Sequence, residues 1–274
     1  MINTLRSEIK RSFCNKLFLL SIIISGVLVL WFAIERIPAC IEMNQELLNG
    51  NTQDNFLEVS YNNWLGSHNL YLQQEILYLI LPFLAVLPFG GSFYADMNHG
   101  YVKNVCIRTK KSHYLISKYI SVFISGGSAV VLPLIFSFVI TSAFLPTMLP
   151  EASYAYTNID STCKWADLFF VHPMLYDILY MVLTFVVSGL IACLSLFITY
   201  FSSKSFLVLI FPFFVYICSS LFFELLSMDK FSLRNILVTD SSYGNTFSVV
   251  VLIVALFIIS FVPYYVIGVK KDVL

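Results

Sequence analysis

Charged residues are scarce in this sequence. Only 12% of its 274 residues are Asp, Glu, Lys or Arg, whereas 58% are hydrophobic. Soluble domains average about 25% charged and about 45–50% apolar residues. A surface with so few charges would not keep a domain of this length dissolved. The composition therefore indicates that lipid, rather than water, surrounds most of the chain.

Several chemical motifs are also missing. The six cysteines form no CxxC pair and have no histidine at metal-ligand spacing, which argues against a metal site. Paired carboxylates and Cys/His sets are lacking in the apolar runs, so we expect no enzyme activity in this chain. The phosphate loop GxxxxGK(S/T) is absent, so we expect no nucleotide or other cofactor here. The net charge is zero and gives no indication of a nucleic-acid partner.

Long apolar runs are what the sequence has instead. A helix needs about 20 apolar residues to cross a hydrocarbon layer of about 30 Å. Six runs approach or exceed this length: residues 17–34, 76–95, 119–149, 178–203, 205–223 and 247–269. The sequence therefore predicts one all-α transmembrane domain over residues 1–274, with six spans. Pro133 would kink the long third run, or the end of that run would leave the membrane.

The basic residues are distributed unevenly between the connections. Lys and Arg accumulate on the cytoplasmic side of membrane proteins. Twelve of the sixteen lie in the N-terminal segment, the second and fourth connections and the tail: Arg6, Lys10, Arg11, Lys16, Lys103, Arg108, Lys110, Lys111, Lys118, Lys204, Lys270 and Lys271. The other three connections carry only Arg36, Lys164, Lys230 and Arg234. Both termini are therefore predicted to be cytoplasmic, in agreement with an even number of spans.

Ionisable residues are missing from the interior of all six runs. Such residues mark proton relays and ion pathways in membrane proteins. Glu75, Asp96, Asp177 and Glu224 stand at the edges of runs, where we expect solvated side chains. The pattern argues against a proton- or sodium-coupled carrier and against a channel lined by charged rings. The energy for any transport would therefore come from another subunit.

The N-terminal segment, residues 1–16, has a helical apolar pattern. Its apolar residues recur at spacings of three and four: Ile2, Leu5, Ile9 and Phe13. Basic residues occupy the opposite side, which predicts an amphipathic helix lying in the inner headgroup layer. The simpler alternative is an ordinary basic flank of the first span.

Residues 96–118 form a second inner segment, too short and too basic to be a domain. Gly100 can end the preceding helix. An apolar patch suited to docking on a protein surface follows it: Tyr101, Val102, Val105 and Cys106. A short transverse helix is the expected form.

This layout resembles the permease subunits of ABC transporters of the type 2 exporter class. Members have an interfacial N-terminal helix, six spans, an acidic residue and a glycine after the second span, a coupling helix, an Arg-containing turn, and a Lys opening the third span. The matching positions are Asp96, Gly100, Arg108, residues 112–114 and Lys118. The proline or second arginine often found beside the turn is replaced by Thr109, Lys110 and Lys111.

The resemblance implies how such a chain would work. Residues 98–107 would sit in a cleft of a cytoplasmic ABC ATPase subunit, which binds the ATP and Mg²⁺, and would transmit its closure to the spans. Lys204 would mark a smaller second contact. The implied ATPase-coupling residues are Asp96, Gly100, Tyr101, Val102, Val105, Arg108, Lys118 and Lys204. Residues 228–246 would form short helices in the outer leaflet.

The resemblance also implies a second permease copy or a related sister permease, and a bacterial plasma membrane. The substrate would be hydrophobic or amphipathic, such as a peptide, an antibiotic, a lipid or a glycan carrier. The alternative is a non-transporting membrane sensor, or an assembly or immunity module, that recruits a cytoplasmic partner through the same inner segment. The loop at residues 35–74 could contact ligands or form a solvated cap.

Overall fold

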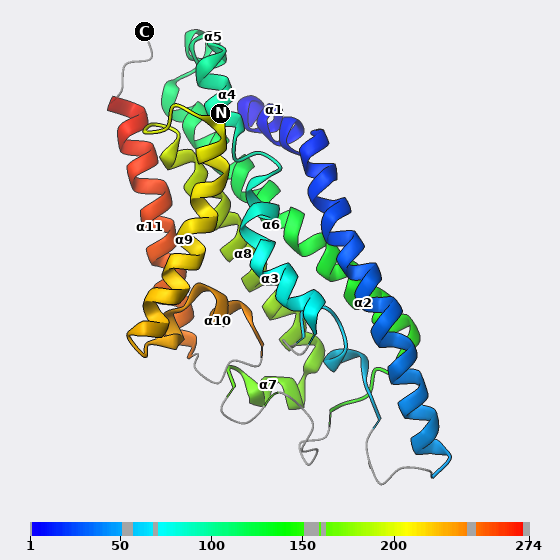
Figure 1. Ribbon diagram of the computed structural model, residues 1–274. Coiled ribbons are helices and arrows are strands. Elements are labelled where there is room, and N and C mark those ends of the chain that lie inside the picture. The colour runs from blue at the N-terminus through cyan, green and yellow to red at the C-terminus, as the bar shows by residue number, and fades with distance from the viewer. Residues whose placement is uncertain are drawn as a thin grey trace.

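The protein is an all-α, multi-pass membrane protein. The computed structural model describes residues 2–50, 57–67, 71–150, 159, 163–239 and 245–270, and every regular element in these ranges is a helix (Figure 1). Five helices among them are long and apolar enough to cross a membrane: α2 (Lys16–Leu48), α6 (Lys111–Phe144), α8 (Pro173–Ile198), α9 (Ser205–Leu225) and α11 (Thr246–Lys270).

The second predicted run is divided into two helices. α3 (Leu72–Val86) and α4 (Ser92–Asn98) are separated by a turn at residues 87–91. Pro88 in this turn has no N–H to continue a helix. Gly90 lets the turn approach α8, because a Cβ atom at this position would lie 2.7 Å from Ser195 Oγ. α3, with 15 residues, is therefore an apolar helix shorter than a straight span.

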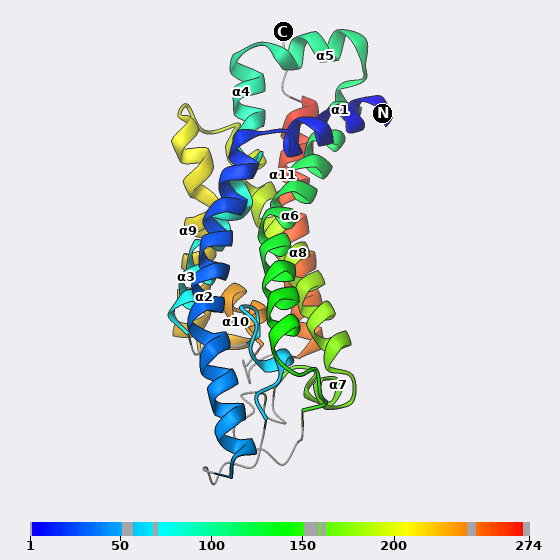
Figure 2. The ribbon, with the colours of Figure 1, turned by 90° about the vertical axis from the view of Figure 1, so that its right-hand side faces the viewer.

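The long helices alternate in direction (Figures 1 and 2). α2, α6 and α9 run from the end that carries α1 (Ile2–Phe13), and α3, α8 and α11 return to it. α4 and α5 (Tyr101–Arg108) also lie at this end, which we call the terminal end. The opposite end, called the loop end, carries η1 (Ser60–Asn62), α7 (Ala166–Val171), η2 (Asp229–Phe231) and α10 (Leu233–Leu237).

Close contact between α6 and α8 forms the centre of the bundle. A Cβ atom on Gly127 of α6 would lie 2.7 Å from the carbonyl oxygen of Phe185, and one on Gly189 of α8 would lie 2.7 Å from that of Phe123. Small residues allow membrane helices to approach in this way. α8 is accordingly the most enclosed long helix, with 72% of its most apolar stretch buried against 17% for α9.

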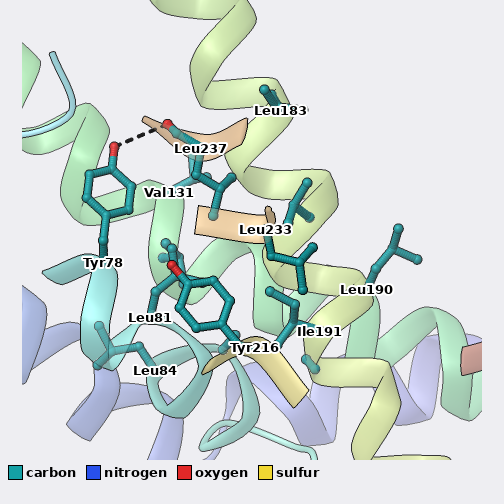
Figure 3. Packing of buried hydrophobic residues seen from close by; sticks show 14 of the residues in the cluster. Tyr78, Leu81, Leu84, Val131, Leu183, Leu190, Ile191, Tyr216, Leu233 and Leu237 are labelled. Carbon is teal, nitrogen blue, oxygen red and sulfur yellow. Dashed lines mark hydrogen bonds between the residues drawn. The ribbon is translucent and has the colours of Figure 1, made fainter. Parts of the chain in front are cut away.

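α10 inserts its side chains between long helices at the loop end. Leu233 and Leu237 are 3% and 0% exposed, and they pack near Leu81 of α3 and Ile191 of α8 (Figure 3). The Tyr78 hydroxyl donates a hydrogen bond to the carbonyl oxygen of Leu237 at 3.5 Å. Short helices were expected over residues 228–246, and η2 and α10 occupy part of this range; residues 240–244 lie outside the described ranges.

Two helix lengths differ from the predicted spans. α2 continues from the predicted end at residue 34 to Leu48, through Glu35, Arg36 and Pro38, so the expected loop 35–74 begins as a helix. Charged residues end an apolar run without ending a helix, because the helical hydrogen bonds do not depend on the side chains. α6 contains Pro133 and ends at Phe144, so residues 145–149 of the third run are not helical.

Candidate functional site

Four charged side chains meet inside the terminal end. Glu8 and Arg11 come from α1, Asp96 from α4 and Lys118 from α6. Lys118 is 0% exposed, Glu8 2% and Asp96 4%. We call these four residues the ionic cluster. The charges of its two cations and two carboxylates sum to zero, and buried charges need such pairing.

Asp96 holds the central position in the ionic cluster. Its Oδ2 atom accepts hydrogen bonds from Lys118 Nζ at 2.6 Å and from the Tyr114 hydroxyl at 2.8 Å. Its Oδ1 atom accepts one from Arg11 Nη2 at 2.8 Å. Glu8 accepts from Arg11 Nη1 at 2.8 Å and from Lys118 Nζ at 3.1 Å. Each charge therefore has a partner of opposite sign on another helix or one turn away.

Aromatic rings cover both cations. The Arg11 guanidinium lies 4.4 Å from the ring centre of Tyr101, which belongs to α5. Lys118 Nζ lies 4.1 Å from the ring centre of Phe89, in the turn between α3 and α4. Cations at such distances are attracted to the faces of aromatic rings. The ionic cluster thus connects α1, α4 and α6 directly, and reaches α5 and the α3–α4 turn through these rings.

The pKa values of Asp96 and Arg11 favour ionised side chains. Burial alone raises the pKa of Asp96, but the hydrogen bond from Arg11 and the charge and hydrogen bond of Lys118 outweigh it, so this pKa lies below its ordinary value. Burial lowers the pKa of Arg11, but Asp96 and Glu8 together hold it above its ordinary value. Asp96 is therefore ionised at neutral pH. Its ion pairs can thus hold α1, α4 and α6 together.

α5 projects beyond the cluster and lies across the end of the bundle (Figure 2). Gly100 precedes it with a φ of 71°, in the left-handed region that favours glycine, and this allows the sharp turn from α4 into α5. The side of α5 that faces away from the bundle carries Lys103, Asn104, Ile107 and Arg108. Ile107 is 84% exposed on this side.

The comparisons with known proteins give a family and no more. A family model described as "Protein of unknown function (DUF2705)" matches residues 18–274. The chain belongs to the DUF2705 family. Neither the curated proteins nor the solved structures contain a match to it. Within the ionic cluster, Asp96 and Lys118 lie inside the range matched by the DUF2705 model, whereas Glu8 and Arg11 precede it.

Within this DUF2705 chain, the apolar side of α5 faces the bundle. The sequence suggested a docking patch of four residues: Tyr101, Val102, Val105 and Cys106. Instead Tyr101 covers Arg11, Val102 is 3% exposed in the core, and Val105 and Cys106 are half-buried against that core. The apolar side of α5 packs against the bundle because burying apolar surface away from water is favourable. The face available to a partner is therefore the one that carries Ile107.

The remaining predicted positions are spread over the terminal end. Lys204 is exposed and immediately precedes α9, outside the ionic cluster. The neighbouring Ser203 carbonyl accepts a hydrogen bond from Tyr94 of α4 at 2.5 Å, which links this turn to α4. α1 is helical as predicted, with Ile2 80% exposed. The other apolar residues of its predicted face are half-buried: Leu5, Ile9 and Phe13.

Three acidic residues were misjudged from the sequence. Glu8 was not singled out, although an acid three residues before Arg11 in a basic helix is a signal for an internal ion pair. Asp177 was expected to be solvated, which is wrong, because it is 1% exposed on α8. The segment with η1 packs against α8 in this part of the bundle. Asp96 was likewise expected to be solvated and is instead buried by its cationic partners.

Proposed function

We propose that this chain is the membrane-spanning permease subunit of an ATP-driven ABC exporter of the type 2 class. It crosses the plasma membrane six times, with α3 and α4 together giving the crossing additional to the five long helices. Its terminal end is cytoplasmic. A separate ABC ATPase subunit binds ATP and Mg²⁺, and a second permease copy or a sister permease completes the transporter. The cargo is hydrophobic or amphipathic.

The placement of the inner segments supports this orientation. α1, α5, the Lys204 turn and the adjoining ends of α2, α6 and α11 lie at one end of the bundle. Together these segments carry most of the basic residues. Basic residues accumulate on the cytoplasmic side. The beginning of α1 and the end of α11 lie at that same end, as an even number of crossings requires.

The observation that carries the proposal is a projecting α5 that is tied to the membrane helices by buried ion pairs. A partner that pushes on the Ile107 face displaces α5 and, through Gly100, α4. Asp96 then pulls on Arg11 of α1, whose side chain is 37% exposed, and on the fully buried Lys118 of α6. Leaving one charge of a buried pair such as Asp96–Lys118 without its partner costs about 3–5 kcal/mol. α6 in turn contacts α8 at the centre of the bundle. Motion at α5 would thus reach the core directly.

Co-purification from the native host tests this proposal. Tagged wild-type protein should recover a subunit that binds and hydrolyses ATP. Ile107→Asp places a charge in the proposed contact and should reduce the recovery of that subunit by about tenfold, the effect of 1.4 kcal/mol. Leu48→Asp is the matched control, because Leu48 is 78% exposed at the loop end, and it should leave recovery unchanged.

Two outcomes would contradict the proposal. If the wild type recovers no ATPase, the exporter has no energy source, and a non-transporting module that recruits another partner becomes the better account. If Ile107→Asp recovers as much ATPase as Leu48→Asp does, α5 is not the docking element.

A further inference from the structure

A groove at the loop end has a chemistry distinct from the ionic cluster. It lies between α3 and α9, with residues of η2 and α10 at its end, and has a volume of about 560 Å³. Aliphatic side chains from both long helices line it: Leu72, Ile76 and Leu79 of α3, and Ile217 and Leu221 of α9. We call it the α3–α9 groove. Its volume falls in the range of about 300–1,000 Å³ that is typical of small-molecule sites.

The polar lining of the α3–α9 groove is acidic. Glu75, Glu224 and Asp229 face it together with one base, Arg234. Arg234 forms an ion pair with Glu75. Glu224 and Asp229 make no ion pair with any residue in the described part of the chain. Among the described residues, these two carboxylates of the groove therefore have no cation paired with them.

A buried hydroxyl beside the groove also lacks a partner. Tyr216 lines the groove from α9, is 1% exposed, and its hydroxyl has no hydrogen bond within the described residues. Figure 3 shows its ring between Leu81 of α3 and Leu233 of α10. Buried polar groups in native proteins are rarely left in this state. The Tyr216 hydroxyl is thus a buried polar group beneath the groove with no hydrogen-bond partner among the described residues.

We infer that the α3–α9 groove binds an amphipathic cation. The apolar body of the ligand packs against the aliphatic residues of α3 and α9, and its positive head lies beside Glu224 and Asp229. An anion would be repelled by the two unpaired carboxylates. A neutral apolar ligand would remove water from them without supplying an opposite charge, which costs free energy. The statement that such a cation is the cargo of the exporter rests on the proposed function. The binding itself does not depend on transport.

Binding of tetraphenylphosphonium, a rigid apolar cation, tests the inference. The protein is placed in nanodiscs of neutral phosphatidylcholine, and binding is measured by equilibrium dialysis with empty nanodiscs subtracted. Wild type should bind the cation saturably. The neutral triphenylphosphine oxide should bind at least about tenfold more weakly, because it gains nothing from the carboxylates.

Three variants locate the site. Glu224→Gln with Asp229→Asn should weaken tetraphenylphosphonium binding about tenfold while leaving the melting temperature unchanged, since neither side chain has an ion pair to lose. Asp167→Asn makes the same kind of charge change on α7, at the same end but outside the groove, and should have no effect. Leu79→Trp fills the groove without changing charge and should abolish binding.

Each result can overturn the inference. Equal affinity for the neutral probe, or unchanged binding in the double variant, would show that the carboxylates do not recognise the ligand. Binding that survives Leu79→Trp would show that the site is elsewhere. None of these measurements uses an ATPase, so their failure leaves the exporter proposal standing, and failure of the co-purification leaves the groove standing.

Discussion

Removing the buried lysine gives the sharpest test of the ionic cluster. Lys118 is 0% exposed, and its ammonium lies 2.6 Å from Asp96 and 3.1 Å from Glu8. Lys118→Met keeps the length and volume of the side chain but leaves two buried carboxylates to share Arg11. Removing one partner of a buried ion pair costs about 3–5 kcal/mol. We expect about 3 kcal/mol, the lower figure, because Arg11 still pairs with both acids.

The assay is thermal unfolding of the purified protein in detergent. For chains of this size, 1 kcal/mol corresponds to about 2–4 °C, so Lys118→Met should lower the melting temperature by about 6–12 °C. Arg234→Met is the control at an exposed pair, whose side chains are 42% and 43% accessible. Such pairs contribute about 0–1 kcal/mol, so its melting temperature should fall by about 4 °C at most.

A second substitution separates the charge effect from simple loss of packing. Glu8→Gln added to Lys118→Met removes one uncompensated carboxylate and should recover at least about 1 kcal/mol of the loss. A melting temperature for Lys118→Met within 1 °C of the wild type, roughly 0.3 kcal/mol, would refute the reasoning. So would a failure of Glu8→Gln to recover any stability.

Three further predictions concern the pH response, the helix packing and the topology. Because the folded pKa of Asp96 lies below its ordinary value of 3.8, its ion pairs stabilise the protein above about pH 4 and are lost as the pH falls through the folded pKa; the melting temperature should drop in this acidic range, and Asp96→Asn should flatten the drop. Gly189→Ala should destabilise the protein by about 1–3 kcal/mol by overpacking, whereas Gly26→Ala, where no atom lies within 4 Å, should not, and denaturation curves would compare the two. In intact cells, a membrane-impermeant maleimide should label Asn49→Cys at the loop end and leave Ser203→Cys at the terminal end unlabelled; the reverse result would contradict the proposed orientation.

The apolar helices could be predicted from the sequence because hydropathy alone determines which segments lipid accepts. All five long helices overlap predicted runs, and Gly100 was correctly expected to end a helix. The break at residues 87–91, inside the predicted run 76–95, coincides with Pro88, Gly90 and Gly91. It depends on Gly90 meeting Ser195, a contact between residues far apart in the chain.

The ionic cluster could be predicted only in part. Asp96 and Lys118 were singled out, but as coupling residues rather than as a pair. Glu8 was overlooked although Arg11, three residues later, signals an ion pair, and its second partner, Lys118, lies 110 positions further along the chain. The apolar side of α5 was assigned to a protein partner because a single helix does not show which neighbour covers it. Residue spacing indicates that a face is buried, but tertiary structure decides what buries it.

Photocrosslinking from α5 in living cells tests the central claim most directly. A photoreactive amino acid is placed at Ile107 on the outward face, at Val102 on the inward face, or at Leu48 at the loop end. If this chain is an exporter permease, position 107 should crosslink to an ABC ATPase subunit, and positions 102 and 48 should not. Absence of an ATPase adduct at position 107, or equal yields at all three positions, would contradict the account.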